Sequence, residues 1–168
     1  ILITSDAGRL HQAREAGVLQ PIQSAFLEQR VPANLRDSEG YWFGFTQRAR
    51  VFVYAPARVN EDELSTYEGL ANADWRGRVL VRSSANVYNQ SLLSAMIDSN
   101  GKQQATQWAR AVRNNMARAP QGSDRDQMRA VAAGLGDVAI VNTYYLGLLA
   151  NSDNQKDRDV AAQLKLFF

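Results

Sequence analysis

The fold class is decided by two apolar segments, Arg78-Val79-Leu80-Val81-Arg82 and Asp137-Val138-Ala139-Ile140-Val141. Each has the length and the branched apolar content of a buried strand. Helical patterns lie between them, over residues 86–98, where Gly101 is expected to end the helix, over residues 102–117, and from Ser123 to about Gly134. Another helix is expected to begin at Tyr144. The order strand, helices, strand, helix predicts the parallel layer of an α/β protein.

Further strands are expected upstream of this layer. Val51-Phe52-Val53-Tyr54-Ala55 is continuously apolar, which is typical of a strand covered on both faces. Ile1–Thr4 and Tyr41–Phe45 have β-like composition and are expected to be strands too. Natural termini are usually exposed and polar, whereas Ile1–Thr4 and Leu164–Phe168 are apolar. We therefore expect the chain to be a piece of a longer protein, and any signal peptide would lie upstream of Ile1.

Composition excludes several classes of chemistry. The 168 residues fit one medium domain or two small lobes, and 45% of them are apolar. The absence of cysteine excludes disulfides, thiolate metal sites and cysteine nucleophiles, and a single histidine, His11, leaves no partner for histidine-rich zinc or copper sites. Basic and acidic residues alternate to a net charge of +2, which argues against nucleic-acid binding. No apolar run is long enough to span a bilayer.

Three tyrosines follow the two strands that decide the fold. In open α/β sheets, ligands bind beyond the carboxyl ends of the strands. Tyr88 lies in the loop after the first strand, and Tyr144 and Tyr145 lie after the second; each loop runs into a helix, whose amino end favours negative charge. A phenol has a pKa near 10, but a trivalent cation can displace its proton, and Fe³⁺ prefers anionic oxygen ligands. The residues permit an iron site, although a Tyr-Tyr pair is more often packing than ligand.

Several neighbouring residues have two interpretations. Ser83, Ser84 and Asn86 precede a helix, where they could hold an anion, hydrogen-bond a tyrosinate or simply cap the helix. Arg82 could offset phenolate charge or form a surface ion pair. No phosphate-binding glycine loop is present, and His11 has no partner with which to form a catalytic triad, so we do not expect an enzyme.

An ordered series of motifs carries a family resemblance across essentially the whole chain. The sequence resembles the periplasmic ferric-iron-binding proteins of ABC transporters, in particular the cyanobacterial-type FutA branch of the FbpA-like family. The matching segments are Thr4-Ser5-Asp6-Ala7-Gly8-Arg9-Leu10, Pro32-Ala33-Asn34-Leu35-Arg36-Asp37, Gln47-Arg48-Ala49-Arg50-Val51, Leu64-Ser65-Thr66-Tyr67-Glu68, Val81-Arg82-Ser83-Ser84, Tyr88-Asn89-Gln90-Ser91-Leu92, Gln121-Gly122-Ser123-Asp124-Arg125-Asp126-Gln127 and Val141-Asn142-Thr143-Tyr144-Tyr145-Leu146-Gly147.

The resemblance implies a type II, transferrin-like periplasmic-binding-protein fold of two lobes, present here in part. It divides the chain into residues 1–49, a partial first lobe and approach to the hinge, residues 50–141, the second lobe, and residues 142–168, a Tyr-Tyr loop, helix and return segment. The strands that cross between lobes would be residues 50–55 and 137–141.

The resemblance also implies the ligands and the partners. Tyr144 and Tyr145 match the family's tyrosine pair and Tyr88 its third tyrosine, while the histidine–tyrosine element would lie upstream of Ile1. Many relatives carry arginine where this chain has Leu148. The protein would be a periplasmic monomer that binds Fe³⁺ through tyrosinates and docks on an inner-membrane ABC permease.

Two alternatives stay open from the sequence. One is a relative of the same fold that binds another anion or a small molecule through Ser83 and Ser84. The other is the ligand-sensing domain of a transcription regulator. A helix-turn-helix upstream of Ile1 would favour the regulator, and a signal peptide there would argue against it.

Overall fold

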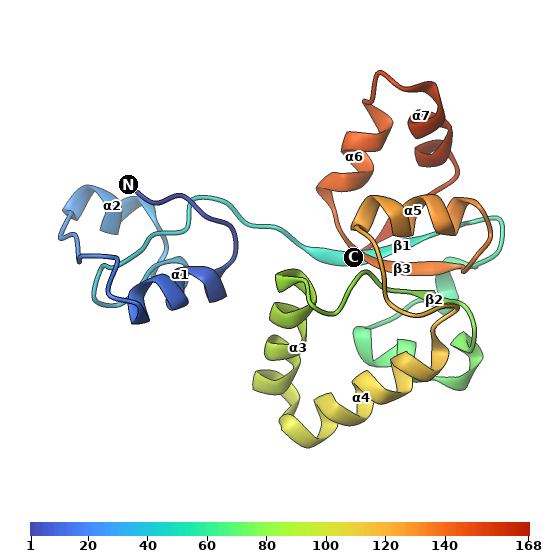
Figure 1. The fold of residues 1–168 in the computed structure, drawn as a ribbon, viewed down its shortest axis with the longest axis horizontal. Helices are drawn as coiled ribbons and strands as arrows, with labels where there is room; N and C mark the ends of the chain where they lie inside the picture. Colours follow the sequence, from blue (N-terminus) through green and yellow to red (C-terminus); the bar gives the residue numbers. More distant parts are fainter. The chain divides into compact units, whose positions relative to one another are not determined.

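The computed structural model describes residues 1–168, which divide into two compact units, Ile1–Gln47 and Arg48–Phe168. The first unit holds two helices, α1 (Ala7–Glu15) and α2 (Ala25–Arg30), and one short 3-10 helix (Figure 1). The Asp6 carboxylate caps α1 by accepting from the backbone N–H of Gly8 at 3.1 Å.

The second unit is built on a four-stranded sheet with the order β2-β3-β1-β4. Its strands are β1 (Arg50–Tyr54), β2 (Val79–Leu80), β3 (Val138–Asn142) and β4 (Lys165–Phe167). As predicted, β2 and β3 are parallel neighbours. The other two pairs, β1 with β3 and β1 with β4, are antiparallel, so the sheet is mixed. The expectation of a parallel layer from Arg78 onward is therefore confirmed, and β1 and β4, whose direction the pattern did not predict, add two antiparallel pairs.

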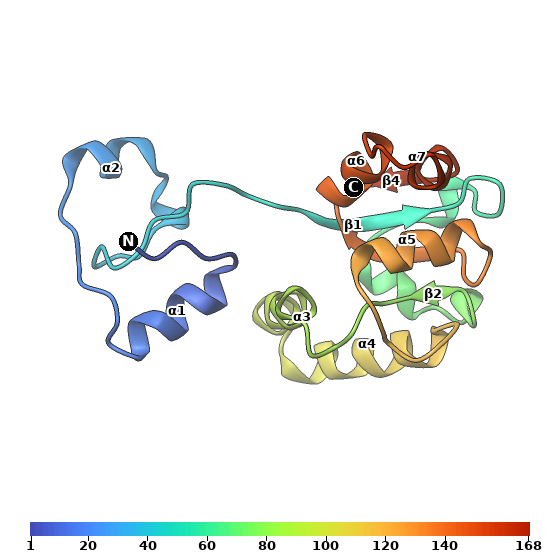
Figure 2. The same cartoon turned by 45° about the horizontal axis from the view of Figure 1, so that its top comes forward.

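Hydrophobic cores cover both faces of the sheet because side chains alternate along β1 and β3. Val51, Val53 and Ala139 point to one face, with α5 (Asp124–Ala132), α6 (Tyr144–Ala150) and α7 (Gln155–Ala162). Phe52 and Ile140 point to the other, with α4 (Lys102–Asn115) and short 3-10 turns over residues 61–75 (Figure 2). The prediction that Val51–Ala55 is covered on both faces is confirmed.

A helical hairpin follows β2. It consists of α3 (Val87–Asn100) and α4, which pack against each other. Gly101 joins them with a φ of 81°, a left-handed conformation that a residue with a side chain rarely adopts. The predicted end of the helix at Gly101 is thus confirmed. None of the helices is both long enough and apolar enough to cross a membrane.

Two predicted strands of the first unit are wrong. Ile1–Thr4 is irregular, and Ile1 and Ile3 are exposed. Tyr41–Phe45 forms no ladder and contributes one isolated bridge, between Phe43 and Arg36. An apolar run becomes a strand only when a neighbouring backbone satisfies its N–H and C=O groups along its length. Ile1–Thr4 has no such neighbour in this unit, and Tyr41–Phe45 shares only two backbone hydrogen bonds with residues 35–37.

Candidate metal centre

Tyr88 is positioned by the turn that connects β2 to α3. The side chain of Asn86 accepts from the backbone N–H of Tyr88 at 2.9 Å and so caps α3. The backbone N–H of Asn86 donates to the carbonyl of Ser83 at 3.1 Å, and the Ser83 hydroxyl accepts from Ala85. Asn86 and Ser83 thus hold the turn together, and Ser84 is exposed. The turn places Tyr88 in the first turn of α3, beyond the carboxyl end of β2.

Tyr144 and Tyr145 begin α6 directly beyond the carboxyl end of β3. Because β2 and β3 are parallel neighbours, both tyrosine-bearing segments emerge at the same end of the sheet. The Tyr144 hydroxyl donates to the Tyr88 hydroxyl at 3.4 Å, and the rings of Tyr144 and Tyr145 lie 4.3 Å apart between centroids. The three predicted tyrosines are therefore brought together, although Tyr88 and Tyr145 are 57 positions apart in the sequence.

Three guanidinium groups surround the ring of Tyr88. Arg48 lies 5.0 Å from the ring centroid, Arg82 5.3 Å and Arg50 5.9 Å. At these distances a cation is attracted to the aromatic ring, and its charge also favours a phenolate over a phenol. The structure places Arg82 in an ion pair with Asp124, whose carboxylate is fully buried. Arg82 is therefore held in an ion pair and lies close to the tyrosines.

The pKa of Tyr88 lies above the ordinary value of a tyrosine. Its hydrogen bond with Tyr144 is the main cause, followed by burial and by the charge that Tyr144 would carry; Arg48 and Tyr145 lower the pKa in part. Tyr88 therefore carries its proton at neutral pH, and a cation bound through its oxygen has to displace that proton. The three hydroxyls form a hard oxygen donor set that suits a trivalent cation better than a soft one.

Sequence reasoning missed the buried polar residues beside the tyrosines. Arg50, Asp124 and Asn142 belong to one hydrogen-bonded network, in which Arg50 and Asn142 face each other across the antiparallel pair β1 and β3. Asp124 follows the helix cap Ser123 in the sequence and resembles an ordinary acidic residue of a first turn. Only the strand register, which the sequence does not reveal, brings these residues together.

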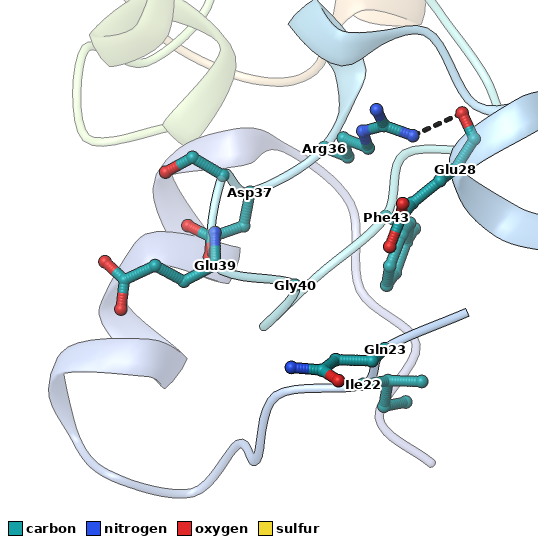
Figure 3. Close-up of a pocket in the computed structure, with 9 residues that line it drawn as sticks. Ile22, Gln23, Glu28, Arg36, Asp37, Glu39, Gly40 and Phe43 are labelled. Carbon is teal, nitrogen blue, oxygen red and sulfur yellow. Dashed lines mark hydrogen bonds between the residues drawn. The ribbon is translucent and has the colours of Figure 1, made fainter. Parts of the chain in front are cut away.

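The first unit has a cavity of about 390 Å³ that contains none of the predicted ligands. Figure 3 shows its polar lining, including Asp37, Glu39 and Arg36. The two carboxylates are already paired, because Arg14 donates to both at 2.6 Å. No group of three or more histidine, cysteine or acidic side chains in the chain is arranged to hold a metal ion. The tyrosine cluster is thus the candidate site.

Comparison with known families gives a match over residues 1–162, to the bacterial extracellular solute-binding proteins. The chain belongs to this family. Among the curated proteins, the chain is similar to iron uptake protein A2 of Synechocystis sp., with 49% identity over the whole chain, and to iron uptake protein A1 of the same organism, with 45% identity. The chain spans about half the length of these relatives, 49% and 47% respectively.

Solved structures of this solute-binding family match the fold. The Trichodesmium protein called IdiA or FutA, determined in complex with iron and citrate, is 49% identical and superposes with a TM-score of 0.94, over 97% of this chain and 52% of that one. The ferric binding protein from Campylobacter jejuni is 40% identical with a TM-score of 0.92, over the same shares of the two chains. The fold class is therefore that of the type II periplasmic binding proteins, present here in part, and the resemblance seen in the sequence is confirmed.

Proposed function

We propose that the protein containing this chain binds Fe³⁺ outside the cytoplasm, in the periplasm, and delivers it to an inner-membrane ABC permease. The observation that carries the proposal is the convergence of Tyr88, Tyr144 and Tyr145 at one end of the sheet, with two of their hydroxyls 3.4 Å apart. The iron-related names of relatives at 45–49% identity support the choice of iron as the transported substrate.

The charges around the tyrosines support a trivalent ion. Three tyrosinates would balance the charge of Fe³⁺, and the guanidinium groups of Arg48, Arg50 and Arg82 would favour the ionised form of Tyr88. Part of that positive charge is neutralised by Asp124. Ser83 and Asn86 would contribute by fixing the turn before α3, which orients the ring of Tyr88, whereas Ser84 is exposed.

The two units would belong to different lobes of a binding protein that closes on its iron. In this proposal Ile1–Gln47 is part of the first lobe, and Arg48–Phe168 is most of the second. The remaining ligands, a histidine and a tyrosine, would come from sequence before Ile1. Hinge closure would then join the two sets of ligands around the ion.

The experiment is a titration of the full-length protein with ferric iron in a buffer that contains no other iron chelator. Tyrosinate bound to Fe³⁺ gives a visible charge-transfer band, so colour should develop to one equivalent in the wild type. Tyr144→Phe, which removes only the oxygen donor, should abolish or strongly weaken the band.

Tyr41→Phe is the matched control for this titration. Tyr41 lies in the first unit with its ring against the guanidinium of Arg14, a contact that phenylalanine retains. The control should keep the colour of the wild type. A wild type without a band, or a Tyr144→Phe variant with an unchanged one, would overturn the iron proposal.

Acid should weaken iron binding. Since Tyr88 is protonated in the free protein and its pKa is raised, Fe³⁺ competes with a proton at this oxygen. The apparent affinity should therefore rise with pH, and binding should release protons that a pH indicator detects. An affinity independent of pH between 6 and 8 would contradict the role of Tyr88.

A further inference from the structure

A buried carboxylate that is not one of the proposed iron ligands lies beside the three tyrosines. Asp124 begins α5, and its side chain is completely inaccessible to solvent. One oxygen accepts from Arg50 Nη1 at 2.8 Å and from the backbone N–H of Asn142 at 2.8 Å, and the other accepts from Arg82 Nη1 at 3.1 Å. A buried charge is tolerated only with such partners, so these groups are held in fixed positions.

Arg50 connects this carboxylate to the rest of the network. Its side chain is 10% exposed, and its Nη1 also donates to the Asn142 side chain at 3.3 Å. Its Nη2 donates to the side-chain oxygen of Asn89 at 2.7 Å and to the carbonyl of Ile140 at 3.1 Å. One planar guanidinium thus contacts the end of β3, the start of α5 and the first turn of α3, a geometry that the fixed fork of arginine favours.

Each side of the network ends at a tyrosine. On one side, Asn89 is adjacent to Tyr88 in the sequence, and its Nδ2 donates to the carbonyls of Arg82 at 2.9 Å and Ser83 at 3.2 Å. On the other side, the Asn142 side chain donates to the Tyr144 hydroxyl at 3.4 Å. The chain of contacts therefore runs from the segment that carries Tyr88, through Arg50 and Asp124, to the segment that carries the tyrosine pair.

We propose that Asp124 and Arg50 are positioning residues that hold Tyr88 and Tyr144 at the spacing iron requires before the ion arrives. The inference rests on the proposed function. A buried ion pair adds little net stability over an apolar replacement of the same shape, and its usual benefit is a defined geometry. Ligands that are already in place bind a metal without the cost of ordering them, and partners outside the ligand set provide that order.

The charge and the geometry of Asp124 predict different results, which makes the inference testable. If Asp124 acted only through its charge, Asp124→Asn would change iron binding little, because unneutralised Arg50 and Arg82 repel Fe³⁺ about as much as they favour the three phenolates. If Asp124 acts by position, Asp124→Asn replaces an acceptor by an amide N–H facing a guanidinium, and binding weakens. We expect iron affinity to fall roughly 10- to 100-fold, the usual effect of losing a partner behind a metal ligand.

The test measures iron affinity against a competing chelator, and the position of the charge-transfer band, in the full-length protein. The variants are Asp124→Asn and Arg50→Lys, which keeps the charge but cannot reach Asp124, Asn142 and Asn89 together. Both should bind more weakly, with a shifted band, because the phenolate geometry changes. Asp126→Asn is the control: it lies on the same helix, where its carboxylate accepts from Ser123, and it does not touch the network.

Asn89→Ala keeps the test decisive if Asp124→Asn does not fold. It removes two donors to the turn and one acceptor from Arg50 without creating a buried unpaired charge, and it should weaken binding in the same direction. Folded variants with wild-type affinity and an unshifted band, or with stronger binding, would overturn the positioning role and leave the iron proposal intact. A wild type with no band would overturn the iron proposal itself.

Discussion

The two units of the chain bury their apolar side chains very differently. In Arg48–Phe168, two cores cover the sheet, whereas in Ile1–Gln47 the one buried hydrophobic residue is Val31. Most of the exposed large hydrophobic side chains belong to the first unit; they are Ile1, Leu2, Ile3, Val18, Ile22, Phe26 and Phe45. Apolar content is thus not sufficient to form a core.

The sheet accounts for this difference. β1 and β3 pair along five residues each, which satisfies their backbone groups and lets alternate side chains enter both cores. The first unit has no such ladder, and polar contacts order it instead. Arg14 bridges Asp37 and Glu39, and backbone N–H groups of the turn donate to Asp37. Contacts of this kind at a surface contribute at most about 1 kcal/mol each.

Removing a core side chain of the second unit should have the largest effect on the free energy of unfolding, and it tests this comparison. Leu80 is fully buried in β2, so Leu80→Ala should lower the free energy of unfolding by about 2–5 kcal/mol. Urea unfolding of the full-length protein followed by circular dichroism measures it. Leu135→Ala, an exposed leucine of the same unit, is the control and should change the free energy by less than about 0.5 kcal/mol. Equal effects of the two variants would contradict the burial described for Leu80.

Helix caps allow a more closely matched comparison of the two units. Ser123 caps α5 in a reciprocal capping box with Asp126, while Ser24 caps α2 of the first unit through one bond, to the N–H of Leu27 at 3.4 Å. Ser123→Ala should lower the free energy of unfolding by about 1 kcal/mol. Ser24→Ala should lower it by less, because Ser24 makes a single bond to a six-residue helix, whereas the Ser123 hydroxyl also donates to the Asp126 carboxylate at 2.8 Å. Both are measured by urea unfolding, and the reverse order would refute this difference between the units.

The smallest expected effect is that of acid on the stability of the folded protein, which acts through the carboxylate of Asp137. Burial disfavours its charge, but hydrogen bonds from Arg78 at 2.7 Å and Arg58 at 2.8 Å outweigh burial and hold the pKa of Asp137 below its usual value. Because the folded pKa is the lower one, this stabilisation is complete above about pH 4, the unfolded value, and disappears as the pH falls through the folded value.

Asp137→Asn tests this pH dependence. The variant should be less stable than the wild type at pH 7, and the difference should shrink below about pH 4, as measured by urea midpoints from pH 7 to pH 3. Asp37→Asn is the counterpart in the first unit, where the N–H of Tyr41 and the guanidinium of Arg14 outweigh burial and lower the pKa of Asp37. A constant difference across the pH range would show that the charge of Asp137 is not the cause.

Local patterns were enough to predict most elements of the second unit. The apolar run at Val51–Ala55 predicted β1, Gly101 predicted the break between α3 and α4, and Tyr144 was correctly predicted to begin a helix. Strand direction was not predictable in the same way. The chain between β1 and β2 crosses the sheet by turns and short 3-10 helices, and only tertiary packing makes β1 antiparallel to β3.

The sequence was enough to predict the tyrosines of the candidate site, but not the residues that hold these tyrosines in place. Phenols that follow two parallel strands converge because of sheet geometry, which a sequence pattern conveys, and their role as iron ligands stays a prediction. Asp124 and Asn89 resemble ordinary helix-start residues, and their burial depends on contacts with Arg50, 74 and 39 positions away in sequence. Long-range polar contacts of this kind leave no periodic signal in a single sequence.

The central place of β3 in the sheet has a consequence for local opening. Its backbone is paired with β1 on one side and with β2 on the other, whereas β2 and β4 are edge strands of two and three residues. Amide protons of Ala139 to Val141 should therefore exchange with solvent only when the whole unit opens, and those of the edge strand β4 earlier. Tyr144 and Tyr145 directly follow this central strand. Local opening at an edge of the sheet should therefore leave the positions of both tyrosines unchanged.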